Sequence, residues 1–410
     1  MRWPLQMIML AVLAGVYAAC SPVMFEKDAD CGVGCVRVNG MKEIEYTVGA
    51  SGGKVDILFV DDNSGSMSFE QNNIAARFSS FLSALDAKQV DYRIGVITTD
   101  VSGPNNGPRA INGNGALQDG RLIAFSNGQY FLEKGTANKE ALFAGVIRRG
   151  ETLTCENYLN SGSSQNASAY AANCPSPDER GIYAASLTVE SNPSGFIRAE
   201  GSLAIVFLSD EDVRSLLYEQ SPAYRLNDRD LPQTLIQIVQ NRFPGKSLSM
   251  HSIIVRPGEL KSGYSAADVA QKISQVITGD YNISVNAQNR PENFFYGADI
   301  SCLNQQGSQT NQVSGSQGYL YYLAAKMTGG VVGDICANNY GSQLSAIGTN
   351  IGEKVNQIAL ACENPKILDL RFTNQSGAPT GSVQGSNFVF NPELTSGQTV
   401  YLKIECPDNM

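Results

Sequence analysis

The feature that most constrains this sequence is a series of short apolar runs that alternate with helical patterns. Each run is apolar almost throughout, which is typical of strands buried on both faces in a parallel sheet covered by helices. In the stretch after the first run, apolar residues recur at spacings of three and four. We therefore predict an α/β main domain with a doubly wound, mostly parallel sheet. The four runs are VDILFV (55–60), YRIGVITTD (92–100), SLAIVFLSD (202–210) and SLSMHSIIV (247–255).

A second, smaller unit is predicted at the C-terminal end of the chain. From residue 361 to 410, apolar and polar residues alternate between Gly, Pro and Asn turns, which indicates a small antiparallel β unit. The main domain is assigned to residues 51–360. Two stretches rich in Ser, Asn, Gln and Gly interrupt it at 160–177 and 304–318, and we predict that both are surface loops.

The N-terminal segment has the pattern of an export signal. Arg2 supplies a positive charge, an apolar stretch follows, and small residues precede Cys20. The sequence VYAAC resembles the lipobox of bacterial lipoproteins, in which the chain is cleaved before a cysteine that carries lipid. The resemblance implies a signal peptide over 1–19, lipidation of Cys20 and a lipid-anchored tether over 20–50. Ser21 in the next position is similar to the sorting pattern for the outer membrane of the bacterial envelope.

The cysteine count fits an exported protein. Nine cysteines leave an even number, eight, when Cys20 is set aside, as expected for structural disulfides. A zinc–thiolate site is disfavoured because there is no repeated CxxC and His251 is the only histidine. The cysteines fall into local couples along the chain. We predict the pairs Cys31–Cys35, Cys155–Cys174, Cys302–Cys336 and Cys362–Cys406.

The charge excludes one class of partner. The formal net charge is −9, and it becomes −10 when Arg2 leaves with the signal peptide. There is no basic cluster in the sequence. Nucleic acids and anionic lipid surfaces are therefore poor partners.

Oxygen-bearing side chains follow two of the predicted strands. Asp62, Ser64 and Ser66 come after the first run in the sequence DNSGS, and Asp210 ends the third run. Ligands of open α/β sheets bind outside the carboxyl ends of the strands, so we expect these four side chains to meet at one edge. Carboxylate and hydroxyl oxygens, completed by water, suit a hard divalent cation. The sequence therefore predicts a metal site made by Asp62, Ser64, Ser66 and Asp210.

Other interpretations of the DDNSGSM stretch account for less of the pattern. An EF-hand loop would need Gly at its sixth and Glu at its twelfth position, and counting from Asp61 or Asp62 does not give both. A P-loop would need more glycine and a Lys before its hydroxyl residue. Two alternatives stay open: an aspartyl nucleophile at Asp61 or Asp62, and a plain helix cap. The cap does not explain Asp210.

The same residues resemble a known family. DNSGSM after an apolar strand closely resembles the DxSxS signature of von Willebrand factor type A (vWA) domains, whose metal-ion-dependent adhesion site (MIDAS) holds Mg²⁺. SLAIVFLSDEDV is similar to the strand that carries the second aspartate of that family, and GYLYYLAAKMTGGVVGDIC is similar to its late segment. The resemblance covers about residues 50 to 360. It implies that Ser64 and Ser66 bind Mg²⁺ or Mn²⁺ directly, and that Asp62 and Asp210 bind it directly or through water.

The resemblance also marks one departure. Where the family has a threonine on a third loop, this chain has SPDERGIYAASL, so that Asp178 or Glu179 is the candidate replacement. An acidic ligand at this position would tighten the bound ion and weaken its attraction for a partner's carboxylate.

Two classes of function follow from these observations. The first is a metal-dependent protein-binding or adhesion module on an exported lipoprotein, in which the ion accepts a carboxylate from a protein or an extracellular polymer. The second is an exported metal-dependent hydrolase or phosphotransferase that uses Asp61 or Asp62. Hydrolysis lacks an evident general base, because His251 lies in a predicted buried strand. We therefore predict recognition rather than turnover.

Overall fold

The computed structural model describes most of the chain after residue 34. The described residues are 35–38, 40–49, 53–102, 118–160, 169–170, 173–175, 179–213, 226–244, 246–278, 291–297, 299–309, 315–354, 357–372, 381–385, 387–390 and 399–407. The segment 1–19, Cys20 and Cys31 lie outside them, so the predicted signal peptide, lipidation and Cys31–Cys35 disulfide stay predictions. Within the described residues, no helix combines the length and the apolar character needed to cross a bilayer.

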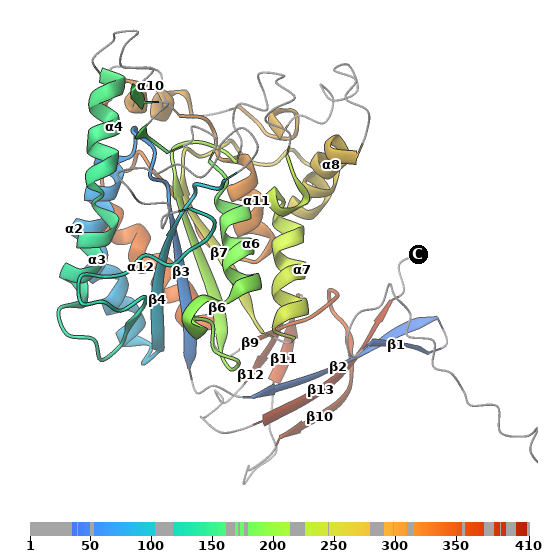
Figure 1. Cartoon of the computed structure of the whole chain (residues 1–410). Helices are drawn as coiled ribbons and strands as arrows, with labels where there is room; N and C mark the ends of the chain where they lie inside the picture. Colours follow the sequence, from blue (N-terminus) through green and yellow to red (C-terminus); the bar gives the residue numbers. More distant parts are fainter. Residues whose placement is uncertain are drawn as a thin grey trace, which may run out of the picture.

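A six-stranded sheet forms the centre of the main domain, in the order β5-β4-β3-β6-β7-β8 (Figure 1). All neighbouring pairs are parallel except β4 with β5. The mixed α/β architecture with a mostly parallel sheet is therefore confirmed. The strands are β3 (Lys54–Asp61), β4 (Asp91–Thr98), β5 (Leu132–Glu133), β6 (Ser202–Ser209), β7 (Leu248–Ile254) and β8 (Val332–Asp334).

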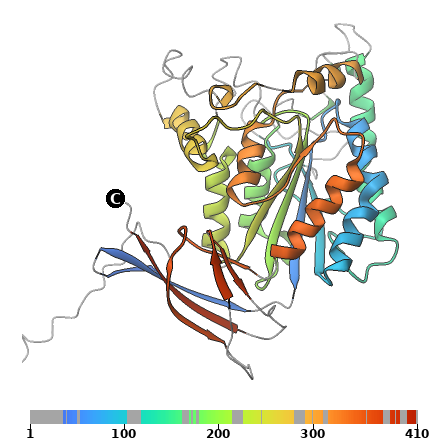
Figure 2. The same cartoon turned by 180° about the vertical axis from the view of Figure 1, so that it is seen from behind.

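Helices cover both faces of this sheet (Figures 1 and 2). Side chains of a strand point alternately to the two faces. Accordingly, Val55, Ile57 and Phe59 pack in the core under α2, α3 and α12, whereas Leu58 and Val60 pack in the core under α6, α7, α8 and α11. These helices are α2 (Ser68–Ala87), α3 (Lys139–Ile147), α6 (Gly181–Ser191), α7 (Pro232–Arg242), α8 (Ala266–Thr278), α11 (Tyr319–Met327) and α12 (Tyr340–Lys354).

The remaining helical segments are two α-helices and three short 3-10 turns among the described residues. They are α4 (Gly150–Asn160), α10 (Ile300–Gln309) and the 3-10 turns η3 (Pro193–Gly195), η6 (Asp228–Asp230) and η8 (Pro291–Phe294). In Figure 1, α4, α8 and α10 lie at the upper end of the domain, toward which β3 runs. Residues 304–309, which we assigned to a surface loop, belong to α10 instead.

The small unit consists of two antiparallel sheets that share a core. One sheet has the order β1-β2-β13-β10 and the other β11-β12-β9. Side chains from both sheets, such as Phe388 and Leu402, pack in one apolar cluster. In Figure 1 this unit lies below the main sheet, at the end where β3 begins. The strands are β1 (Cys35–Val38), β2 (Met41–Gly49), β9 (Gln357–Ala359), β10 (Lys366–Phe372), β11 (Gly381–Gln384), β12 (Asn387–Phe390) and β13 (Thr399–Pro407).

The extent of this unit corrects part of the sequence-based assignment. Residues 35–49 were assigned to the tether, but they form β1 and β2, and β2 pairs with β13 over its whole length. Similarly, β9 was assigned to the main domain but pairs with β12. Alternating residues in β2, with Ile44 and Tyr46 on the apolar side, give this strand the pattern of a half-buried strand.

Three disulfides join residues that the sequence paired. They are Cys155–Cys174, Cys302–Cys336 and Cys362–Cys406. The first lies in the segment that contains α4, the second joins α10 to the chain after β8, and the third closes the small unit.

Candidate functional site

The carboxyl ends of β3 and β6 lie side by side at one edge of the main sheet. Asp61 at the end of β3 is in register with Leu208 of β6, and the backbone N–H of Asp62 donates to the Leu208 carbonyl oxygen at 3.0 Å. Each strand is followed directly by an aspartate. This pairing therefore brings Asp62 and Asp210 to the same point of the edge.

The predicted ligand oxygens converge there. Ser64 Oγ lies 3.0 Å from Ser66 Oγ, and Ser66 Oγ donates to Asp210 Oδ1 at 3.1 Å. Asp62 is fixed by two donors: the backbone N–H of Ser64 at 2.8 Å and Ser209 Oγ at 2.6 Å. The four residues predicted from the sequence thus form one continuous hydrogen-bonded group.

The group is layered by exposure. Asp62 and Asp210 are fully buried, whereas Ser64 and Ser66 retain 6% and 7% of their surface. Asp210 Oδ2 is buried and has no hydrogen-bond partner among the described residues. The hydroxyls therefore form the outer layer of the site, and the carboxylates form its floor.

The carboxylates of the floor are held in an unfavourable electrostatic environment. Burial raises the pKa of Asp62 to about 6, although the bonds from Ser209 and Ser64 oppose the shift. Burial, followed by the neighbouring Asp62 and Glu211 carboxylates, raises the pKa of Asp210 well above its ordinary value. Clustered carboxylates without a cation favour protonation of one of them, and a bound cation would remove this penalty.

The oxygen spacing fits a small divalent cation. Mg²⁺ binds oxygen at 2.0–2.1 Å in octahedral geometry, so that neighbouring ligand oxygens lie about 3.0 Å apart. The two separations in the Ser64–Ser66–Asp210 group have this value. Together with the orphaned Asp210 Oδ2, the spacing makes the residues a fitting donor set for such an ion.

Glu179 lies beside this group, whereas Asp178 is outside the described residues. The Glu179 side chain is buried, and its Oε2 has no hydrogen-bond partner in the described part of the chain. Burial, then the Glu211 and Asp62 carboxylates, raises the pKa of Glu179 well above its ordinary value.

Sequence reasoning missed two buried polar residues near the site. Glu70, in the first turn of α2, accepts a hydrogen bond from Gln306 Nε2 of α10 at 2.9 Å, and burial raises its pKa to about 7. Gln71 donates to the Asp62 carbonyl oxygen at 2.9 Å. Both follow Ser66 by about one helical turn, which was the available sequence signal.

Of the alternative catalytic residues, Asp62 belongs to this group, whereas Asp61 and His251 lie outside it. Asp61 projects to the face of the sheet opposite to Asp62, where Gln71 Nε2 donates to its Oδ2 at 3.4 Å. His251 is fully buried in the middle of β7, where its Nδ1 accepts from the Val331 N–H at 3.1 Å and its Nε2 lies 3.1 Å from Ser249 Oγ. His251 is therefore a core residue of the sheet, as its surroundings in the sequence indicated.

Comparison with known proteins gives only distant similarities. No family model matches the sequence, and no curated protein matches it. Among solved structures, the pilus adhesin SpaC from Lactobacillus rhamnosus GG is 10% identical with a TM-score of 0.31, and the match covers 90% of this chain and 41% of that one. The type V pili tip protein Mfa5 from Porphyromonas gingivalis is 11% identical with a TM-score of 0.27, over 90% of this chain and 65% of that one.

A third similar structure is proximal thread matrix protein 1 from the mussel byssus. It is 13% identical with a TM-score of 0.23, over 57% of this chain and 46% of that one. The chain thus spans less than two thirds of each of these proteins. At these identities and TM-scores, the similarities carry no argument about function.

Proposed function

We propose that this protein is a metal-dependent binding module, with a vWA-type doubly wound sheet and a MIDAS-like site that holds Mg²⁺ or Mn²⁺. The observation that carries the proposal is the convergence of the Ser64, Ser66 and Asp210 oxygens, 3.0 and 3.1 Å apart, beside the buried Asp210 Oδ2, which has no hydrogen-bond partner among the described residues. Asp62 lies beneath the hydroxyls, and its carboxylate is proposed to bind the ion directly or through a water molecule. Glu179 is the proposed ligand from the third loop.

The place of the site in the sheet supports this proposal. From the carboxyl end of β3 the chain passes through α2, on one face, to β4 on one side, and from the carboxyl end of β6 it passes through α7, on the other face, to β7 on the opposite side. The strand order therefore diverges at the carboxyl ends of β3 and β6. In open α/β sheets, such a divergence leaves a crevice in which ligands bind.

The donor chemistry favours recognition. A bound divalent ion supplies a positive charge and positions for further oxygen ligands. Two neutral hydroxyls neutralise it less than carboxylates do, so that it retains attraction for an acidic group, and an ionised Glu179 among its ligands would weaken this attraction. The partner is accordingly proposed to be a protein or an extracellular polymer that presents a carboxylate, and the protein to be a lipoprotein of the outer membrane, anchored at Cys20.

The surface around the site offers further contact area. Phe69, next to Ser68 in α2, is 47% exposed, and Leu153 in α4 is 52% exposed. A single ion–carboxylate contact does not offset the loss of freedom on association, so apolar neighbours of the site are needed for affinity. Phe69 and Leu153 are the proposed contacts.

Affinity capture tests the proposal. Envelope extract is passed over immobilised protein in Mg²⁺ and eluted with EDTA, with Ser64→Ala as the test variant and Asp86→Ala, an exposed aspartate of α2, as the matched control. We expect a partner that is released by EDTA from the parent protein and from Asp86→Ala, and that is absent with Ser64→Ala. Equal capture by Ser64→Ala, or capture that persists in EDTA, would contradict the proposed function.

A further inference from the structure

The loop 62–66, which carries three of the proposed ligands, is covered by a separate segment that contributes no proposed ligand. We define this segment, the α4 clamp, as α4 with Tyr170 and the disulfide Cys155–Cys174. Gly65, between the two serines, lies directly against it: a Cβ atom on Gly65 would be 2.9 Å from the Cys155 carbonyl carbon and 3.0 Å from the Glu156 nitrogen. Real Cβ contacts are not this short, so the loop and the α4 clamp fit only because position 65 has no side chain.

Hydrogen bonds join the α4 clamp to the same loop. Thr152 Oγ1 donates to the Asn63 carbonyl oxygen at 3.2 Å, and the Gly65 N–H donates to the Tyr170 hydroxyl at 3.5 Å. Ser68, just after the loop, donates to Glu156 Oε2. The α4 clamp therefore contacts the backbone of both residues that separate the ligand side chains, Asn63 and Gly65.

Gln71 extends this connection beneath the loop. Its Nε2 donates to the Asp62 carbonyl oxygen at 2.9 Å and lies 3.2 Å from Thr152 Oγ1, and its Oε1 accepts from the Arg149 N–H at 3.3 Å. Thr152 is fully buried and takes part in both bonds, as acceptor from Gln71 and donor to Asn63. The Thr152 hydroxyl thus links Gln71, which holds the Asp62 carbonyl oxygen, to the Asn63 carbonyl oxygen of the same loop.

We propose that the α4 clamp positions the ion-binding loop, so that the affinity of the site for a divalent cation depends on Thr152 and on the Cys155–Cys174 disulfide. This inference rests on the proposed function, because it concerns the same ion. Ligand oxygens must be held within about 0.5 Å of their binding geometry. The loop backbone at Asn63 and Gly65 is held by the α4 clamp, and the disulfide ties α4 to the chain that carries Tyr170.

The test is a Mn²⁺ titration of the full chain, followed by electron paramagnetic resonance. Thr152→Val keeps the shape of the side chain and removes its hydroxyl, so we expect about a tenfold loss of affinity, comparable to the loss of outer-shell support in other metal sites. Thr152→Ser restores the hydroxyl and should restore the affinity. A purely structural role for Thr152 would instead lower the melting temperature in EDTA and leave the Mn²⁺ affinity unchanged.

Two further pairs of variants make the test independent of Thr152. Gly65→Ala should weaken Mn²⁺ binding, whereas Gly145→Ala, at a position where a Cβ meets nothing within 4 Å, should not. Likewise, Cys155→Ser with Cys174→Ser should weaken binding, and Cys362→Ser with Cys406→Ser, in the small unit, should not.

The outcomes separate this inference from the proposed function. A parent protein that binds no Mn²⁺ would overturn both. A parent protein that binds Mn²⁺, together with unchanged affinity in Thr152→Val and in the Cys155/Cys174 variant, would overturn this inference alone.

Discussion

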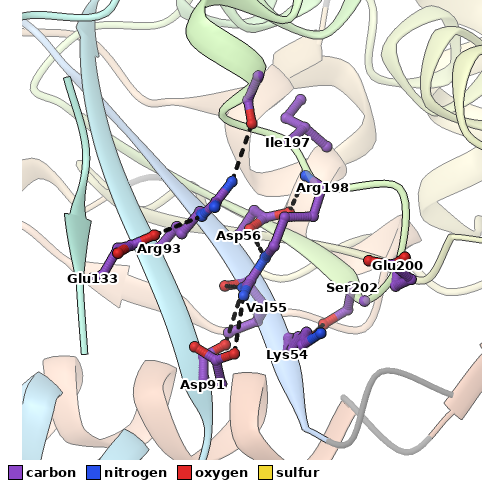
Figure 3. Close-up of polar contacts among 12 residues, drawn as sticks. Lys54, Val55, Asp56, Asp91, Arg93, Glu133, Ile197, Arg198, Glu200 and Ser202 are labelled. Atoms are coloured by element: carbon purple, nitrogen blue, oxygen red, sulfur yellow. Dashed lines mark hydrogen bonds and ion pairs between the residues drawn. The ribbon is translucent and has the colours of Figure 1, made fainter. Parts of the chain in front are cut away.

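The two ends of the central sheet both bury carboxylates, but they hold them differently. At the amino end, Asp56 accepts from the Arg198 backbone N–H at 2.7 Å and from its Nε at 2.8 Å (Figure 3). The remaining guanidinium nitrogens donate to the Val55 carbonyl oxygen and to Asp91. At the carboxyl end, Asp62 and Asp210 form no ion pair with Lys or Arg among the described residues, and the neighbouring charges that raise the pKa of Asp210 are all acidic.

The difference separates a carboxylate that is compensated within the fold from a group of carboxylates that a bound cation would stabilise. Taking a carboxylate out of water is unfavourable unless a positive charge and hydrogen bonds compensate it. Arg198 provides both for Asp56. The carboxyl end provides hydrogen bonds for Asp62 but leaves its charge, and that of Asp210, uncompensated, which is the condition that a divalent ion would relieve.

The largest effect is expected from breaking the amino-end pair. Arg198→Ala leaves Asp56 buried without its cation, and we expect a loss of about 3–5 kcal/mol in the free energy of unfolding. Chemical denaturation in EDTA and in Mg²⁺ measures it, and the loss should be the same in both. Glu353→Ala, which removes an exposed pair with Lys88, is the control and should cost under about 1 kcal/mol. A loss in Arg198→Ala that Mg²⁺ reverses would show that the two ends are not independent.

The carboxyl end should make stability depend on pH in the absence of metal. The pKa of Glu70 is raised to about 7 in the folded protein, so the unfolded chain ionises this group at lower pH than the folded one. The folded state is therefore favoured below about pH 4.5, and this contribution is lost as pH rises toward 7, by about 1.4 kcal/mol per unit of pKa difference. In EDTA, the unfolding free energy of the parent protein relative to Glu70→Gln should fall by on the order of 3 kcal/mol over this window.

The measurement is a series of denaturation curves of both proteins between pH 4.5 and 7.5. Because the comparison is a difference between two variants, the opposite contribution of His251, whose pKa is lowered to about 3 by burial, cancels. A difference that does not change with pH across this window would mean that the pKa of Glu70 is ordinary. The buried carboxylates at the carboxyl end would then be less destabilising than their contacts indicate.

A smaller effect is expected from Glu179. Glu179→Gln removes a carboxyl group whose ionised form is disfavoured by burial and by its acidic neighbours, so the melting temperature in EDTA should rise. The Mg²⁺ affinity should fall about tenfold, because a proposed ligand or near neighbour of the ion can no longer carry a negative charge. Calorimetric titration measures the affinity and a thermal scan measures the stability. If both quantities stay at the parent values, Glu179 lies outside the ion's influence.

Much of the fold could be predicted because its signals are local. The predicted bounds of the four apolar runs lie close to the observed bounds of β3, β4, β6 and β7. A short, continuously apolar segment between two helical patterns is readily assigned to a buried strand of a parallel sheet. The convergence of Asp62, Ser64 and Ser66 needs only one turn, and Asp210 joins them through the general geometry of parallel strands. The predicted site is therefore largely a consequence of local sequence and one pairing.

The missed features depend on distant contacts. β2 pairs with β13, which lies near the other end of the sequence. The alternating residues of β2 predict a strand, but they do not indicate which strand it pairs with. Gln306 meets Glu70, 236 residues away, and Thr152 meets Asn63, 89 residues away. Contacts between residues so far apart in the chain cannot be predicted from the local pattern of a single sequence.

The central claim is that Ser64, Ser66 and Asp210 hold a divalent cation, and anomalous diffraction from crystals soaked in Mn²⁺ tests it most directly. The account predicts an anomalous peak bound by Ser64 Oγ and Ser66 Oγ at roughly 2.0–2.3 Å, and its loss in crystals of Asp62→Ala. Crystals that show Mn²⁺ only at other positions, or none at these serines at saturating concentration, would contradict it.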